Sequence, residues 1–277
     1  MTTTTEGLAP RQGGLRRSFS DALLITGRNL RRIPRIPELA IFAIIQSIMF
    51  VLLFALVFGG AITGFPDPSA YREYLLPGIF VQTIVFAAAT VAIGMCDDIN
   101  KGIIDRFRSL PMSRSAVLIG RTFSEVVYNA GILVVLMLAG LVVGWTVHTD
   151  LVSFLAGVAL LLAFAYAMAW LGVWLGVVVP TVEVAQQVSF TVLFPITFVS
   201  GVFVPIATMP DWLQPFAYWN PVTTLASSLR NLWGNPNPQV ADNFPTQNPI
   251  LVTVIWIIVF VAVFGPLGVR RYRNMSR

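Results

Sequence analysis

The sequence has few of the side chains on which enzymes and metal sites usually depend. Its 277 residues contain one cysteine, Cys96, one histidine, His148, and one lysine, Lys101. One thiol and one imidazole are too few for a structural zinc site, and a lone cysteine cannot form a disulfide within the chain. The lysine follows Asn100, so the sequence lacks the G-x-x-x-x-G-K-[ST] loop that binds the phosphates of ATP. We therefore expect Cys96 to be an apolar filler, His148 to be a solvated turn residue, and any ATP site to belong to another chain.

Charged residues are also scarce. Asp, Glu, Lys and Arg make up 11% of the sequence, hydrophobic residues make up 56%, and the mean hydropathy is +0.77. A soluble globular domain needs more polar surface than this composition provides. The composition therefore predicts an integral membrane protein.

Six apolar stretches are long enough for a membrane-spanning helix, which needs about 20 residues to cross a hydrocarbon core about 30 Å thick. They lack the strict alternation of barrel strands, and a helix satisfies its own backbone hydrogen bonds in lipid. The third and fourth stretches exceed one crossing, which indicates tilt or a helical extension into water. We predict an all-α fold with spans over residues 39–62, 75–96, 115–145, 151–179, 184–206 and 249–269.

The basic residues are distributed unevenly between the two ends of these spans. Sixteen of the 18 lie before the first span, in or just after the connection between spans two and three, or in the C-terminal tail. The positive-inside rule then places both termini and residues 97–114 in the cytoplasm. His148 falls on the opposite side from most of the acids, which argues against a Ser-His-Asp triad. The basic balance indicates contact with anionic lipids and makes a nucleic-acid partner improbable.

The N-terminal region divides into two parts. Residues 1–14 are polar and Thr-rich, which favours a disordered tail over a signal peptide. In residues 15–36, Leu15, Phe19 and Leu23 recur at helical spacing, which predicts an amphipathic helix on the inner membrane surface. The alternative is a plain basic flank that only sets orientation. The arginines around the apolar residues are Arg16, Arg17, Arg28, Arg31 and Arg32.

The stretch DDINKGIIDRFRSLPMSR between spans two and three is dense in acids and bases. Its apolar residues recur at i, i+4, i+8 and i+11, which predicts a short amphipathic helix over residues 98–110, ended by Pro111. Asp98 and Asp105 lie three and four residues from Lys101, at pairing distance on such a helix. One face would contact the membrane domain and the other a partner, whereas a solvated loop is the alternative. The apolar stripe consists of Ile99, Ile103, Phe107 and Leu110.

The acids of this stretch also permit an enzymatic interpretation. Asp97, Asp98 and Asp105 invite comparison with the aspartate-rich magnesium and diphosphate sites of membrane prenyltransferases. A D-D-x-x-D run would require an acid at the position of Lys101, and the sequence has no second acid-rich loop. The departure from this pattern disfavours a magnesium-dependent enzyme.

Prolines interrupt an aromatic stretch that follows span five, and they exclude one continuous helix there. We predict short helices over residues 207–232 that dip into the outer interface, where Trp and Tyr prefer to lie, although a plain aromatic belt is the alternative. The prolines are Pro205, Pro210, Pro215 and Pro221, and the aromatic residues include Trp212, Phe216, Tyr218, Trp219 and Trp233.

Span five offers a candidate lining for a substrate path. Phe190, Phe194 and Phe198 share one helical face, and they either line a path or pack against lipid and other helices. The polar residues Glu183, Gln186 and Gln187 at the start of this span either receive the polar part of a substrate or cap the helix. Two G-x-x-x-G pairs, at residues 140 and 144 and at residues 172 and 176, permit close helix contact, although this spacing is a weak signal in so apolar a chain.

Two motifs together resemble a known family. RFRSLPMSR after span two and VFVPIATMPDWLQPFAYWNPVTTLASSLR after span five look like those of the ABC-2 type permeases, most closely the daunorubicin-resistance group of ABC exporter membrane subunits, and the resemblance covers residues 18–270. It implies a six-helix domain over residues 37–270, followed by a basic tail over residues 271–277. It also implies a dimer, with the same or a related permease, and two separate cytoplasmic ATPase subunits that hold ATP and Mg.

The resemblance assigns roles to the segments described above. It makes residues 15–36 the connecting helix, residues 98–110 the coupling helix, and residues 207–232 the outer re-entrant helices. Many relatives carry a Glu where Asp97 and Asp98 stand, so it leaves open which acid faces the ATPase. The residues that it assigns to ATPase coupling are Asp97, Asp98, Lys101, Gly102, Asp105, Arg106, Arg108, Leu110 and Pro111.

The expected function is ATP-driven export of an apolar or amphipathic compound, such as a drug, an antibiotic or a lipid-like molecule, across the cell membrane. The chain itself would be neither an enzyme nor the carrier of a cofactor. Two alternatives stay open, namely export of a lipid-linked or polysaccharide product, and a membrane scaffold or sensor that transports nothing.

Overall fold

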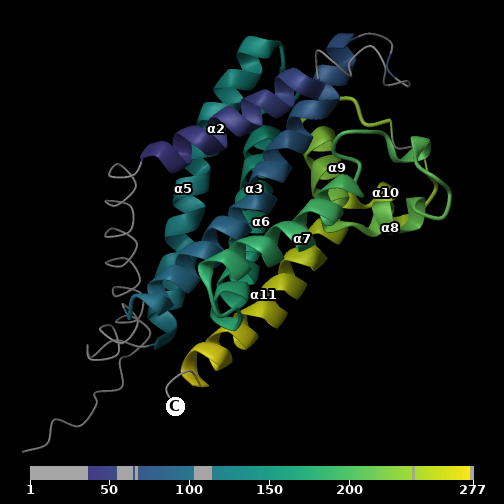
Figure 1. Cartoon of the computed structure of the whole chain (residues 1–277). Helices are drawn as coiled ribbons and strands as arrows, with labels where there is room; N and C mark the ends of the chain where they lie inside the picture. Colours follow the sequence, from purple (N-terminus) through teal and green to yellow (C-terminus); the bar gives the residue numbers. More distant parts are fainter. Residues whose placement is uncertain (1–36, 55–64, 66–67, 103–113, 239–240, 275–277) are drawn as a thin grey trace, which may run out of the picture.

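The computed structural model describes residues 37–54, 65, 68–102, 114–238 and 241–274 (Figure 1). All regular structure within these ranges is helical. The predicted tail over residues 1–14, the predicted surface helix over residues 15–36 and most of the charged stretch after span two lie outside the described residues.

Four helices have the length and apolar composition needed to cross a membrane. They fall within α3 (Pro68–Asn100), α5 (Arg114–Val143), α6 (Leu151–Val178) and α11 (Pro249–Asn274). These confirm helices at the second, third, fourth and sixth predicted spans, and α3 begins and ends several residues beyond the predicted 75–96. The prediction of an all-helical membrane protein therefore holds for the described residues.

The remaining two predicted spans correspond to shorter helices. The span predicted over residues 184–206 contains α7 (Val182–Phe198), an apolar helix that ends before the chain turns at Ser200. The span predicted over residues 39–62 begins with α2 (Pro37–Leu52), and its last part lies outside the described residues. The count of six spans stays a prediction.

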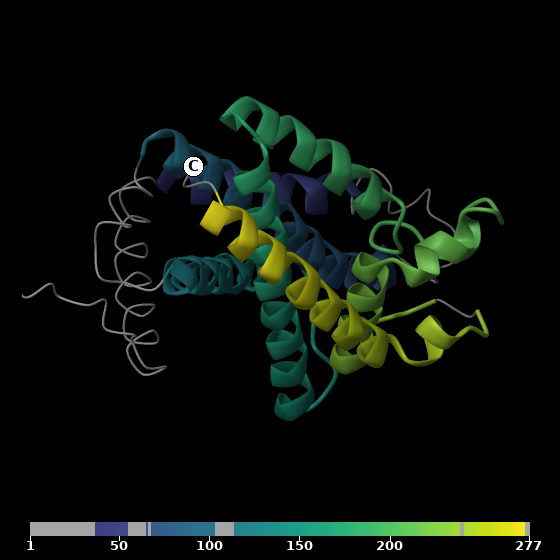
Figure 2. The same cartoon turned by 90° about the horizontal axis from the view of Figure 1, so that it is seen from below.

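The centre of the fold is the pair formed by α3 and α6, and α11 packs on the other side of α6 (Figures 1 and 2). Gly172 and Gly176 of α6 make this contact possible. A Cβ atom on Gly172 would lie 2.4 Å from the backbone oxygen of Ala88, and one on Gly176 would lie 2.4 Å from that of Ala92. The second G-x-x-x-G pair thus brings two backbones together. By contrast, Gly144 of the first pair has a φ of +97° and lies in the turn after α5.

The start of α6 is fixed by a capping residue. The carboxylate of Asp150 accepts hydrogen bonds from the Ser153 hydroxyl and from the backbone N–H groups of Val152 and Ser153. These bonds, above all the one from the Ser153 hydroxyl, lower the pKa of Asp150 below its usual value. The cap replaces backbone partners that the first turn of any helix lacks.

The proline-rich segment after α7 forms short helices in place of one long one. These are η3 (Ile206–Thr208), α8 (Gln214–Trp219) and α9 (Pro221–Trp233), and α10 (Phe244–Gln247) follows. Asn220 caps α9 by accepting from the N–H of Val222, while its amide donates to the carbonyls of Ile196 and Val199 at the end of α7. Proline breaks thus lie where the sequence predicts them.

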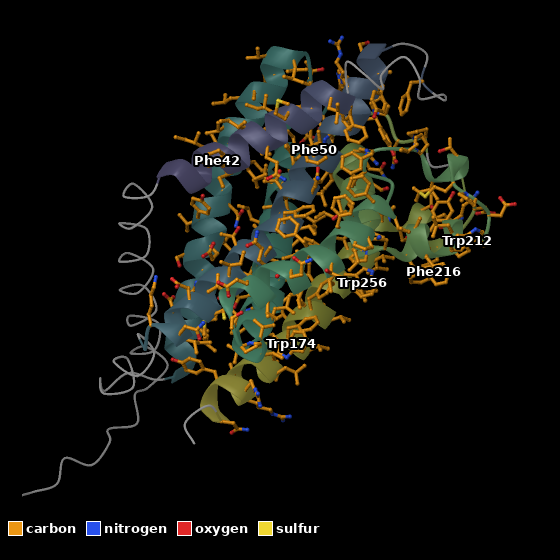
Figure 3. All side chains as sticks on the ribbon, in the orientation of Figure 1. Phe42, Phe50, Trp174, Trp212, Phe216 and Trp256 are labelled. Carbon is orange, nitrogen blue, oxygen red and sulfur yellow. The ribbon has the colours of Figure 1, made fainter. Side chains whose placement is uncertain are left out.

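Aromatic side chains project from this short-helix region. Trp212 and Phe216 are 71% and 68% exposed, and Figure 3 shows both at the margin of the molecule. Trp219 of α8 stacks on Phe244 of α10, with ring centroids 6.5 Å apart. Exposed Trp and Phe rings at the end of a membrane protein are typical of a membrane interface.

The helix boundaries differ from the sequence prediction at two places. The helix predicted over residues 98–110 begins inside α3, which continues to Asn100 and is followed by a turn with Gly102 at a φ of +63°. A positive φ cannot continue a right-handed helix, so α3 ends before Gly102. The helix predicted over residues 98–110 stays a prediction, because residues 103–113 lie outside the described residues. The basic tail predicted over residues 271–277 is helical as far as Asn274, because α11 extends into it.

Candidate functional site

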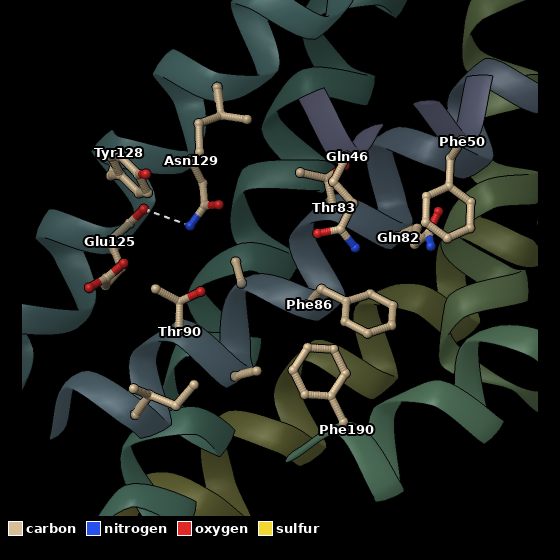
Figure 4. Close-up of a pocket in the computed structure, with 14 residues that line it drawn as sticks. Gln46, Phe50, Gln82, Thr83, Phe86, Thr90, Glu125, Tyr128, Asn129 and Phe190 are labelled. Carbon is tan, nitrogen blue, oxygen red and sulfur yellow. Dashed lines mark hydrogen bonds between the residues drawn. The ribbon is translucent and has the colours of Figure 1, made fainter. Parts of the chain in front are cut away.

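A pocket with a volume of about 190 Å³ lies among α2, α3, α5 and α7 (Figure 4). Its lining combines amide, hydroxyl and carboxyl groups with aromatic rings, which is the mixture expected of a site for an amphipathic ligand. The polar lining residues are Gln46, Gln82, Thr83, Thr90, Glu125, Tyr128 and Asn129, and the aromatic ones besides Tyr128 are Phe50, Phe86 and Phe190.

Helical periodicity brings the lining residues to the pocket. On α5, Glu125, Asn129 and Ile132 follow one another at i, i+4 and i+7 and therefore share a face. On α3, residues 82, 86, 89, 90 and 93 do the same, and the small side chains at 87 and 89 leave space beside the larger ones. Phe190 closes the pocket from α7, with its ring centroid 5.7 Å from that of Phe86.

Glu125 is the acidic residue of the pocket. In the part of the chain that the structure describes, no group donates a hydrogen bond to its carboxylate and no basic side chain forms an ion pair with it. Arg121, one helical turn earlier, instead pairs with Asp98 near the end of α3. The carboxylate of Glu125 is thus left facing the pocket (Figure 4).

Asn129 has unused hydrogen-bonding capacity in the same pocket. Its amide nitrogen donates to the backbone oxygen of Glu125 at 2.8 Å, whereas its Oδ1 atom is buried and has no partner among the described residues. The side chain as a whole is 3% exposed. A buried acceptor without a donor is uncommon in folded proteins, and it indicates a group that a ligand or water satisfies.

The structure separates the residues predicted for a substrate path. Phe190 lines the pocket, but Phe194 and Phe198 do not, because they stack on each other with centroids 4.2 Å apart. At the start of α7, the three polar residues of the same prediction are exposed and do not line the pocket; they are Glu183, Gln186 and Gln187.

The residues predicted for ATPase coupling are divided in a similar way. Lys101 lies at the end of α3 and pairs with Asp97 at 2.7 Å, not with Asp98 as its spacing indicated. Asp98 is held by Arg121 of α5. The others lie outside the described residues, namely Asp105, Arg106, Arg108, Leu110 and Pro111, and so do Arg16, Arg17, Arg28, Arg31 and Arg32.

Arg230 of α9 is fully buried, which no local sequence pattern indicated. Its guanidinium donates to the backbone oxygens of Tyr74 at 2.9 Å, Gly201 at 2.8 Å and Val202 at 3.1 Å. It also lies over the ring of Tyr74, 3.5 Å from the centroid, and the Tyr74 hydroxyl donates to Gly201. Arg230 therefore ties α9 to α3 and to the turn after α7.

No metal site competes with this pocket among the described residues, where no three His, Cys, Asp or Glu side chains come together. The arrangement can bind a ligand, but it offers no nucleophile with an adjacent base. We therefore treat it as a candidate binding site.

Comparison with known proteins agrees with the two sequence motifs. The pattern of the family described as "ABC-2 type transporter" matches residues 21–233. The chain is 29% identical over 241 residues to the daunorubicin resistance ABC transporter permease protein DrrB1 of Streptomyces coeruleorubidus, which covers 87% of this chain and 81% of the relative. It is 26% identical over 264 residues to the probable doxorubicin resistance ABC transporter permease protein DrrC of Mycobacterium tuberculosis, which covers 94% of this chain and 92% of the relative.

The match to the family covers most of the chain, and the long apolar helices agree with it. The chain therefore belongs to the ABC-2 type transporter permeases, multi-pass proteins of the cell membrane that hydrolyse no ATP themselves and leave ATP binding to a separate subunit.

Proposed function

We propose that this permease is the membrane subunit of an ATP-driven exporter of amphipathic compounds. The observation that carries the proposal is the pocket among α2, α3, α5 and α7, which combines polar groups with aromatic rings, and of these helices α3 and α5 are long enough to cross a membrane. Family membership supports transport, and the names of two relatives refer to daunorubicin and doxorubicin resistance.

The proposed complex contains two permease chains, either identical or related, and two ATPase subunits. Each permease has six spans, with both termini and the segment after α3 in the cytoplasm, as the distribution of basic residues indicates. Residues 15–36 form the connecting helix and residues 207–232 the outer re-entrant helices. The coupling segment comprises the turn at the end of α3 and the residues up to Pro111.

The proposed mechanism links this segment to the pocket. Closure of the two ATPase subunits displaces the coupling segments, and the displacement reaches the end of α3. The ion pair between Asp98 and Arg121 joins that end to α5. Glu125 lies one helical turn from Arg121, so a shift of α5 against α3 changes the shape of the pocket.

The polar residues at the start of α7 could contact a compound before it reaches the pocket. Glu183, Gln186 and Gln187 are exposed, and Phe190 is the next residue on that helix to line the pocket. We propose that a compound passes this polar end on its way to Phe190. The pocket volume of about 190 Å³ fits a small amphipathic molecule and does not favour export of a polysaccharide.

Reconstitution tests this function. The permease and its ATPase subunit are placed in proteoliposomes, and uptake of daunorubicin is followed with ATP outside. We expect the isolated permease to hydrolyse no ATP, and the complex to hydrolyse ATP and take up the drug. An ATPase subunit without its catalytic glutamate is the matched control. Hydrolysis by the uncontaminated permease, or a complex that moves neither daunorubicin nor any other amphipathic compound, would contradict the proposal.

The coupling segment is tested by reversing charge. Changing both Arg106 and Arg108 to Glu should weaken ATPase binding or uncouple hydrolysis from uptake, because like charges brought together at such a contact can cost several kcal/mol. Arg271→Glu, at an exposed position of α11, is the control. Phe107→Asp should act differently and lower the amount of folded permease, because it places a charge on the apolar stripe. If the double variant assembled, hydrolysed ATP and took up drug as the wild type does, the coupling role would be refuted and the segment would be interpreted as a solvated loop.

A further inference from the structure

An acidic side chain that forms no hydrogen bond or ion pair with the described residues lies within a candidate membrane-spanning helix. Glu125 is 11 residues from the first residue of α5, or about 16 Å along the helix axis at 1.5 Å per residue. No group in the described part of the chain bonds to its carboxylate, and the nearest arginine along α5, Arg121, is paired with Asp98. Acidic residues inside a membrane are costly and commonly mark a ligand path, because they need a positive partner.

A second unsatisfied group lies beside it. The Oδ1 atom of Asn129 is buried and forms no hydrogen bond with the part of the chain that the structure describes. The residue is 3% exposed and lines the same pocket one helical turn from Glu125. Both free atoms are acceptors. Gln82 of α3, which is 4% exposed, adds an amide to the same lining. A ligand that donates hydrogen bonds satisfies these acceptors, and one that also carries positive charge compensates the carboxylate.

The opposite side of the pocket is aromatic. The rings of Phe86 and Phe190 lie 5.7 Å apart at an interplanar angle of 45°, and Phe50 lies on the same side, whereas Tyr128 lies beside Glu125 and Asn129 on α5 (Figure 4). Such rings favour contact with a flat apolar group, and their faces also attract a cation. A carboxylate and a free acceptor thus face an aromatic surface across one small pocket.

We propose that this pocket binds protonated amines that carry an aromatic or other flat apolar group, with the ammonium at Glu125 and Asn129 and the apolar group against Phe86 and Phe190. The proposal rests on the export function above and specifies its substrate class. A neutral alcohol of the same shape can donate one hydrogen bond but leaves the charge of the carboxylate uncompensated. An anionic ligand would be repelled by the carboxylate of Glu125. The nearest arginine along α5, Arg121, is already paired with Asp98.

Direct binding tests this proposal without ATP. The full-length permease in lipid nanodiscs is dialysed to equilibrium against radiolabelled 2-(2-naphthyl)ethylamine, and in parallel against 2-(2-naphthyl)ethanol, with empty nanodiscs to subtract partition into lipid. The two probes differ only in the ammonium and the hydroxyl group. We expect the amine to bind about tenfold to hundredfold more tightly than the alcohol, the range given by one hydrogen bond to a charged group. Equal affinities would overturn the proposal, and this comparison needs no variant.

Variants locate the ammonium. Glu125→Gln keeps the size of the side chain and removes its charge, so the amine should bind about tenfold to hundredfold more weakly while the alcohol is unaffected. Glu125→Asp should retain part of the preference, and Asn129→Leu should reduce it. Asp211→Asn, at an exposed acid outside the pocket and outside the proposed path, is the matched control. Unchanged amine binding by a folded Glu125→Gln variant would also overturn the proposal.

The outcome is separable from that of the transport experiment. Charge-selective binding without any ATP-driven uptake would support the site and contradict the export function. ATP-driven uptake of the amine and the alcohol at equal rates, with the Glu125→Gln complex fully active, would support export and contradict the site.

Discussion

Replacing Arg230 with methionine should destabilise the permease more than replacing any exposed arginine. The guanidinium is fully buried and donates to three backbone oxygens, those of Tyr74, Gly201 and Val202. A hydrogen bond from a charged group contributes about 1.5–3 kcal/mol, which gives about 4–9 kcal/mol for the three together. Methionine keeps part of the apolar stem and the carbonyls relax toward other donors, so we expect a loss of about 4 kcal/mol.

The assay is thermal unfolding of the purified permease in detergent, followed by size-exclusion chromatography. A loss of 1 kcal/mol lowers the Tm of a large domain by about 2–4 °C, so Arg230→Met should melt on the order of 10 °C below the wild type. Arg230→Lys should fall between the two, because an ammonium cannot match the planar fork of the guanidinium. Arg271→Met, at an exposed position, is the control and should not shift the Tm.

One result would refute this reasoning. If Arg230→Met had the same Tm as the wild type and the same amount of protein in the membrane, the three hydrogen bonds to carbonyls would contribute no net stability. A change in uptake without a change in Tm would instead assign Arg230 to transport.

Three further perturbations have expected outcomes. In a Cys96→Ala background, a cysteine at Asn237 should react with an impermeant maleimide in intact cells and one at Ser113 should not; labelling of Ser113 from outside would contradict the six-span topology. Gly176→Val should reduce the yield of folded permease, because its Cβ would lie 2.4 Å from a backbone oxygen of α3. A Cβ at Gly131 has no neighbour within 4 Å, so Gly131→Val should be tolerated. Equal yields of the two variants would argue against the close packing of α3 and α6. Asp150→Asn keeps a cap for α6 but cannot titrate. Because the folded pKa of Asp150 is lowered, its stabilisation is present above the unfolded pKa and is lost as the pH falls through the folded pKa. The variant should therefore show a smaller loss of Tm than the wild type in that acidic range, and an identical pH profile would contradict the cap.

Features set by local sequence were predictable. A run of apolar residues long enough to cross a bilayer must form a helix there, so the positions of α3, α5, α6 and α11 follow from composition and length. Proline positions likewise indicated where the chain after α7 breaks into short helices. Helix ends were less accurate, as the extension of α3 to Asn100 shows, because its last turn contains two acids and reads as polar sequence.

Features set by distant partners were not predictable. Asp98 was assigned to Lys101 by spacing, but its observed partner Arg121 lies 23 residues away on another helix. The partners of Arg230 lie up to 156 positions away, so nothing local marked it as buried. Glu125 could have been found, because an acid inside the predicted span 115–145 is itself a functional signal, but its neighbours from α3 and α7 are visible only in the fold.

The glycine contact between α3 and α6 limits how this permease can change shape. At Gly172 and Gly176 the backbones of α6 and α3 lie so close that rotation or sliding of one helix would bring side chains against carbonyl oxygens, so we expect the pair to move together. Motion that opens and closes the pocket must then come from α2, α5 or α7, which line it and contact α3 elsewhere. In this view α3 and α6 stay fixed relative to each other, and the pocket opens or closes when a neighbouring helix moves against α3.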